Sequence, residues 1–290
     1  MLRASFIGLI VLTLATPSGL FAGNNLEILE QVAAASEKVQ PGLENYQATV
    51  QTSRIEEMMT SLTSGMPADV LPPPAPVIIK LWQRNGKGLV STRQTQLPPY
   101  VDKMVKQLSA NMAVELNQIL LPIDRTEQRG QLVKDARVKS SEVSVADDLI
   151  LHLEILFAKP TDLNEAFYTS GMRLPQKQVN SLIFDIDART NTISEMRILA
   201  ENELQLSVGI RYLAVAGGYI PKHFRITSPG GKIDDLFEVK FVKIDSYFLP
   251  ASMLRVIRRP ELEDSLEVFF KDHRVNQPIP EDIQTRLDQQ

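Results

Sequence analysis

The chain has 290 residues, of which 43% are hydrophobic and 23% are charged, and its formal net charge is -4. These fractions are typical of a globular protein and exclude wholesale disorder, while the net negative charge argues against nucleic acid as the main partner. The sequence contains no cysteine, which excludes disulfides, thiol nucleophiles, thiolate metal sites and a lipid-modified N-terminal cysteine.

The first 22 residues have the pattern of a secretory signal peptide. Arg3 supplies a positive start, residues 6–15 form an apolar run, and Pro17 and Ala22 follow it. Such a charged start, short apolar stretch and small-residue exit direct export, and the run is too short to span a bilayer. Cleavage after Ala22 would leave residues 23–290 as one domain. An uncleaved N-terminal anchor is the alternative.

Between residues 26 and 97 the sequence predicts short helices and strands. Apolar residues at helical spacing predict a helix over residues 26–39, which Pro41 and Gly42 end. Alternation of apolar and polar residues predicts a strand over 46–51. The segments expected next are a helix over 54–62, a proline-rich connection over 67–76, and strands over 77–82 and 89–92 joined by an Asn85-Gly86 turn.

The most regular helical pattern covers residues 98–121. Its apolar residues, which include Met104 and Met112, form one stripe at a spacing of 3.6 residues. Proline suits the first turn of a helix and cannot continue one, so Pro98 and Pro122 mark its two ends. We expect a long amphipathic helix here.

From residue 149 onwards, alternation with a period of two dominates. Strands are predicted over 149–157, 180–187, 193–199, 204–212, 219–227, 237–241, 253–257 and 266–270. Turn residues separate them, so successive strands should form an antiparallel meander. Some strands carry apolar residues on both faces, which indicates either apolar cover on each face of the sheet or a sheet that curls round its apolar cover. We therefore predict an α+β fold, with a curved antiparallel β-sheet (an incomplete barrel) covered by α-helices. A sheet buried by dimerisation is the alternative.

No pattern in the sequence indicates catalysis. His152, His223 and His273 lie far apart, and no two have the spacing of metal ligands. The Gly217-Gly218 and Gly230-Gly231 pairs separate strands and do not open helices, so a phosphate-binding loop is not expected. We expect a protein without catalytic residues, without a metal and without a cofactor.

The densest group of cations is Arg255, Arg258 and Arg259. We interpret it as a solvated strand edge that resists aggregation, and contact with an anionic head group or an acidic partner is the alternative. Met58, Met59, Met104 and Met112 are interpreted as core, although methionine can also line an adaptable apolar cavity.

The order of elements resembles the periplasmic outer-membrane lipoprotein carrier and lipoprotein-sorting superfamily. The resemblance rests on an exported chain with a short helix and the strand NYQATVQ (45–51), the turn at 187–192, YIPKHFRI (219–226) and LEVFFKDHRVN (266–276). It covers most of the exported chain as a pattern of elements and contains no invariant motif. The resemblance implies a curved sheet lidded by helices around an apolar cavity for acyl chains. The triple proline and the helix over 98–121 depart from a minimal carrier, and the cavity arginine of that superfamily has no assigned counterpart here.

Our leading hypothesis is a periplasmic, non-enzymatic carrier that binds lipid or lipoprotein acyl chains, with helices acting as a movable lid. The expected cavity lining is Leu151, Leu153, Ile155, Leu206, Val208, Val239 and Phe241, with Met104 or Met112 from the lid. Each of these residues could instead be packed core. The alternative function is a periplasmic protein-interaction module, such as an envelope stress sensor or an assembly accessory, with an envelope protein as partner.

Overall fold

The computed structural model of the chain describes residues 27–67, 69, 75–84, 88–92, 99, 103, 120–145, 148–163, 166–168, 178–201 and 203–288. The predicted signal segment therefore lies outside the described residues. So do most of the proline-rich connection and nearly all of the helix predicted over 98–121, including Met104 and Met112.

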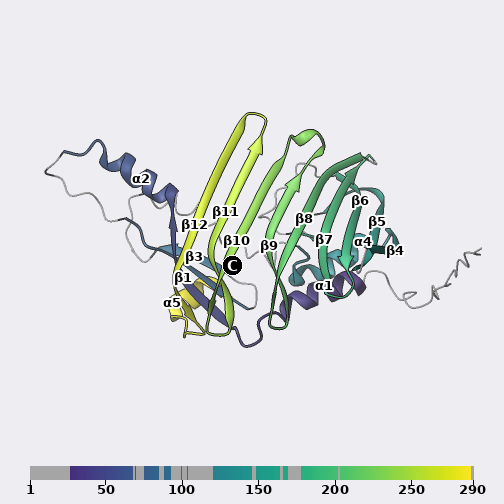
Figure 1. Cartoon of the computed structure of the whole chain (residues 1–290), viewed down its shortest axis with the longest axis horizontal. Helices are drawn as coiled ribbons and strands as arrows, with labels where there is room; N and C mark the ends of the chain where they lie inside the picture. The colour runs from purple at the N-terminus through teal and green to yellow at the C-terminus, as the bar shows by residue number, and fades with distance from the viewer. Residues whose placement is uncertain are drawn as a thin grey trace, which may run out of the picture.

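The described strands form one twelve-stranded antiparallel sheet that does not close into a barrel (Figure 1). Their order is β3-β2-β1-β12-β11-β10-β9-β8-β7-β6-β5-β4, so each strand from β4 to β12 pairs with the next one in sequence. The predicted meander and the α+β fold of an incomplete barrel with helices are confirmed. The strands are β1 (Asn45–Thr52), β2 (Ile78–Gln83), β3 (Gly88–Thr92), β4 (Arg137–Val145), β5 (Asp148–Asp162), β6 (Gln178–Asp187), β7 (Thr192–Ala200), β8 (Glu203–Val215), β9 (Gly218–Thr227), β10 (Asp234–Ile244), β11 (Tyr247–Arg259) and β12 (Leu262–Val275).

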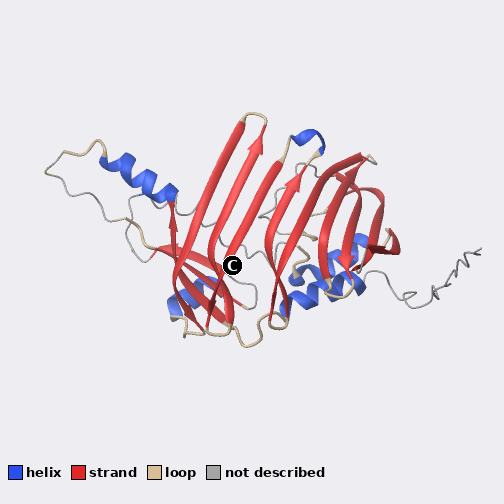
Figure 2. Ribbon diagram, in the orientation of Figure 1, coloured by secondary structure: helices blue, strands red, loops and turns tan. Residues whose placement is uncertain are grey.

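Short helices accompany the sheet (Figure 2). They are α1 (Glu27–Glu37), α2 (Ser53–Thr63), α4 (Thr126–Val133) and α5 (Glu281–Asp288), with 3-10 turns η2 (Ile123–Arg125) and η3 (Pro229–Gly231). Among the described helices, none has the length and apolar character needed to cross a membrane.

The main core lies on the face of β5–β9 against which α1 and α4 pack, which we call the inner face. Paired residues such as Leu153 and Phe184, and Met196 and Val208, point to this face from adjacent strands. Helix α1 contributes Leu29 and α4 contributes Val133 to the same cluster. This segment of the sheet is therefore closed on its inner face by helices.

The opposite, outer face of β5–β7 is polar, so the expected apolar cover on both faces is not found at these strands. It is found at β2, where Ile78 and Leu81 point to opposite faces and belong to different apolar clusters. On the outer face of β5–β7, the Asp185 carboxylate contacts the imidazole of His152 at 2.7 Å and the guanidinium of Arg197 at 2.9 Å. Lys139 pairs with Glu154 at 3.3 Å. The apolar outer residues of β5, such as Ile150 and Leu156, are only half-buried. They surround these ion pairs and do not form a second core.

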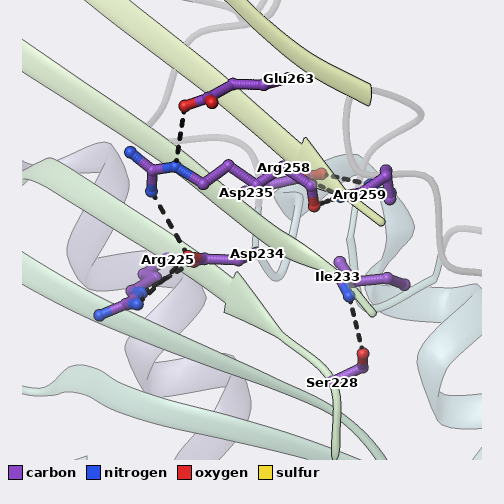
Figure 3. A network of polar contacts seen from close by, with 8 residues as sticks. All are labelled: Arg225, Ser228, Ile233, Asp234, Asp235, Arg258, Arg259 and Glu263. Carbon is purple, nitrogen blue, oxygen red and sulfur yellow. Dashed lines mark hydrogen bonds and ion pairs between the residues drawn. The ribbon is translucent and has the colours of Figure 1, made fainter. Parts of the chain in front are cut away.

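The outer face of β9–β12 carries a similar row of ion pairs (Figure 3). Asp234 accepts from Arg225 at 2.9 Å and contacts Arg258 at 3.4 Å, and Arg258 reaches Glu263 at 3.3 Å. The hydrogen bond from Arg225 holds the pKa of the Asp234 carboxyl below its ordinary value. These pairs join four strands across the sheet.

The cationic run 255–259 is therefore not at a strand edge, which corrects its interpretation from the sequence. Its strand, β11, pairs with β10 on one side and β12 on the other. Arg258 and Arg259 bind carboxylates of Asp234 and Asp235, and the Arg255 guanidinium lies 5.1 Å from the centre of the Phe237 ring. The run pairs with acidic and aromatic residues inside the sheet.

Candidate functional site

A pocket of about 60 Å³ lies between α1 and the inner face, near the turn that joins β6 to β7. Helix α1 provides Val32, Ala35 and Ser36, and the sheet provides Ile193, Ile210, Tyr212, Tyr219, Pro221 and Phe224. The remaining lining residues are Leu120, Leu121, Thr190, Asn191, Thr192 and Gly218. The pocket thus lies where α1 meets the edge of the main core.

None of the described residues that line this pocket carries a charge. The Tyr212 hydroxyl donates to the carbonyl oxygen of Ile193 at 2.9 Å, and burial raises the pKa of its phenol, so it stays neutral. An ionised group entering such a site would lose its hydration without gaining a partner, which is costly. The pocket therefore suits an aliphatic or other uncharged group.

The N-terminal half of α1 is held in place by hydrogen bonds from a buried arginine. Arg129 of α4 is only 2% exposed, and its guanidinium donates to both carboxylate oxygens of Glu30 on α1, at 2.9 and 2.8 Å. It also donates to the carbonyl oxygens of Pro122 and Ala166 at 2.7 and 3.0 Å, and to the Thr126 hydroxyl at 2.9 Å. This bidentate pair joins α1 to α4 and to the segment that follows β5.

The rear end of α1 is fastened by Arg84, which follows β2. Its guanidinium donates to the carbonyl oxygens of Glu37 and Leu43 at 2.9 and 2.8 Å, and also to those of Val39 and Gln40. A cation at the C-terminal end of a helix satisfies carbonyls that have no partner within the helix. Helix α1 is consequently held at both ends, with the pocket beside its middle and rear part.

The cavity residues expected from the sequence lie mainly in the core. Leu151, Leu153, Ile155, Leu206 and Val208 belong to the main cluster on the inner face. Val239 of β10 is 7% exposed and Phe241 is half-buried. None of these seven residues lines the pocket, although Val208 and Leu206 continue along β8 from the lining residue Ile210. Their role in binding stays a prediction.

A second apolar cluster occupies the inner face of the other half of the sheet. It contains Val50, Ile78, Val268 and Phe270, with Ile55 at the start of α2. The side chain of Lys80 is 4% exposed, and its ammonium group lies 5.5 Å from the centre of the Phe270 ring. This cluster is separate from the main core on β5–β9, and the pocket adjoins the main core.

The three histidines do not form a common site. His152 binds Asp185 on the outer face, and His273 Nε2 lies 2.8 Å from the carbonyl oxygen of Pro250. His223 lies on β9, where burial and the nearby Arg211 lower its pKa. Ser141 stands opposite His152 in the β4–β5 register, but Ser141 is exposed and no hydrogen bond joins the two. Among the described residues, no group of three or more His, Asp or Glu side chains could hold a metal ion.

Arg129, Arg84 and Gln40 were not identified from the sequence. Each acts through partners distant along the chain: Arg129 through Glu30, and Gln40 through the backbone of Phe248. The polar sequence TEQRGQLV around Arg129 has no periodicity that would indicate a buried side chain. Only Pro41 and Gly42, which end the helix predicted over 26–39, marked the neighbourhood of Gln40.

No known protein family matches the chain, and no curated protein does. Solved structures similar to it include an outer membrane lipoprotein-sorting protein domain from Vibrio parahaemolyticus, with 10% identity, a TM-score of 0.35 and coverage of 91% of this chain and 99% of that one. A LolA superfamily protein from Nitrosomonas europaea has 10% identity and a TM-score of 0.32, covering 88% and 96% of the two chains.

A third similar structure is a DUF1329 family protein from Desulfovibrio piger, with 10% identity and a TM-score of 0.35, covering 89% and 95% of the two chains. The first two come from the superfamily that the element order resembles. At these identities and TM-scores, what the chain binds has to be inferred from its own residues.

Proposed function

We propose that the chain is a non-enzymatic carrier of the periplasm that binds acyl chains of lipids or lipoproteins between α1 and the inner face. The observation that carries the proposal is the uncharged pocket beside α1, which adjoins the main apolar core. The signal-like residues 1–22 support export of residues 23–290, which we take to act as one domain. Burial of an acyl chain there is favourable by about 25 cal/mol for each Å² removed from water.

Binding a whole acyl chain requires α1 to move. The pocket measures about 60 Å³, whereas pockets for small ligands typically hold at least roughly 300 Å³. Displacement of α1 would extend the pocket from Ile210 along β8 to Val208 and Leu206. These residues and the other inner-face positions selected from the sequence are therefore proposed as the lining of the loaded state.

A tryptophan at position 35 tests this site. Ala35 lines the pocket, so Ala35→Trp should fill it and weaken binding of a fluorescent fatty acid by roughly tenfold or more. Ala34→Trp is the matched control, because Ala34 is the neighbouring alanine on α1 and does not line the pocket. Equal affinities of the two variants would place the binding site elsewhere.

If the wild-type protein binds no fatty acid, the proposed carrier function is excluded. A protein partner crosslinked in cells, without bound lipid, would then favour the interaction module. The proposal needs no catalytic group, so the binding experiments decide between the two functions.

A further inference from the structure

Among the neighbouring strands from β4 to β12, β9 and β10 pair over the shortest stretch. These strands pair over residues 223–227 and 234–238, whereas β10 pairs with β11 along its whole length. Residues 218–222 of β9 and 239–244 of β10 have no register with each other. Pro221, which lacks an N–H group, and a bulge between β8 and β9 at this level account for the divergence. The two halves of the sheet are thus joined by a short ladder.

Residues 38–44, which we call the strap, connect the turn between β8 and β9 in one half to the start of β11 in the other. The Gln40 N–H donates to the carbonyl oxygen of Ala216, in the turn between β8 and β9, at 2.7 Å. The Gln40 side chain accepts from the N–H of Phe248 and donates to its carbonyl oxygen, at 2.5 and 3.1 Å, at the start of β11. Gln40 is 8% exposed, so the hydrogen bonds that join both halves are largely shielded from water.

The strap is also the direct continuation of α1 and fits its surroundings closely. A Cβ atom on Gly217 would approach the carbonyl oxygen of Lys38 to 2.4 Å, and one on Gly218 would lie 3.1 Å from Val39. Gln40 follows Glu37, the last residue of α1, by only three positions. Because so few residues connect them, a movement of α1 away from the inner face should also displace Gln40.

We propose that the strap couples the position of α1 to the junction between the two half-sheets. When α1 leaves the inner face, Gln40 releases Phe248 and Ala216, and the halves are free to move about the short β9–β10 ladder. This coupling goes beyond the proposed function, because it holds whichever ligand the pocket takes. The hydrogen bonds of residues 239–244 of β10 and of Phe248 in β11 should therefore weaken when α1, which packs against β9, is loosened.

Amide hydrogen exchange on the full chain tests the coupling. Leu29→Ala removes a side chain that is 1% exposed and so loosens α1, and Glu30→Gln weakens its bond to Arg129 as a milder change. In both variants the Phe248 amide and the amides of 239–244 should exchange about fivefold faster or more, together with those of α1. Exchange at Val268 in the middle of β12, which belongs to a different apolar cluster from Leu29, should remain at the wild-type rate.

Gln40→Ala provides the second half of the experiment. It should accelerate exchange at Phe248 by itself, and adding Leu29→Ala should then give no further acceleration there, because the connection is already broken. Glu37→Gln on α1 and Gln277→Ala, an exposed glutamine with one backbone hydrogen bond, are the controls. The coupling is overturned if loosening α1 leaves Phe248 at its wild-type rate, or if the effects of the two substitutions at Phe248 simply add.

Discussion

At the scale of single residues, the most constrained side chain is Arg129. A guanidinium that is 2% exposed must have partners for its donors, and Arg129 finds them in the Glu30 carboxylate, a hydroxyl and two carbonyls. Burial alone would raise the pKa of the Glu30 carboxyl, but the hydrogen bonds from Arg129 and Thr126 hold it below the ordinary value. The bond between α1 and α4 therefore depends on an ionised Glu30.

This dependence predicts how stability changes with pH. A carboxyl whose pKa is lower in the folded state stabilises the protein above its unfolded pKa, and this stabilisation is lost as the pH falls through the folded pKa. Wild type should exceed Glu30→Gln in stability above about pH 4.5, the ordinary value. The difference should shrink as the pH falls below that value. Urea unfolding at several pH values measures it, and a difference independent of pH would contradict the assignment.

At the scale of elements, alternation located β6 to β9 because their inner residues are buried and their outer residues are polar. The same rule could not locate β4, whose sequence RVKSSEVSV is exposed along most of its length, so no face selects apolar residues. The pocket was equally hard to predict. Its walls come from a helix, two turns and three strands that only the tertiary fold brings together.

Alanine substitutions at two glycines test how closely the strap contacts the turn before β9, through their effects on the free energy of unfolding. Gly217 and Gly230 both have positive φ, 79° and 72°, so alanine is strained at either position. At Gly230 an added Cβ would meet nothing within 4 Å, whereas at Gly217 it would meet the Lys38 carbonyl oxygen. Gly230→Ala should cost about 1 kcal/mol of unfolding free energy. Gly217→Ala should cost clearly more, and equal costs would mean that the strap is not tightly held.

At the scale of the whole molecule, the two faces of the sheet from β4 to β12 differ in the kind of side-chain contact that they carry. The outer face of β4–β12 is joined across strands by ion pairs, which, being exposed, each contribute little to stability. The inner face of β5–β9 carries the main apolar core and is covered by α1 and α4, which Arg84 and Arg129 hold in place. Under the proposed function, uptake of an acyl chain would require these helices to move while the strands stay paired, as a lid does.

The central claim is that the inner face takes up an acyl chain, and native mass spectrometry of gently purified protein tests it most directly. We predict a bound species whose extra mass is that of a lipid, absent after delipidation and restored by adding a fatty acid. In Ala35→Trp the bound species should be depleted, while Ala34→Trp should retain it. Protein that carries no lipid and takes up no added fatty acid would contradict the account.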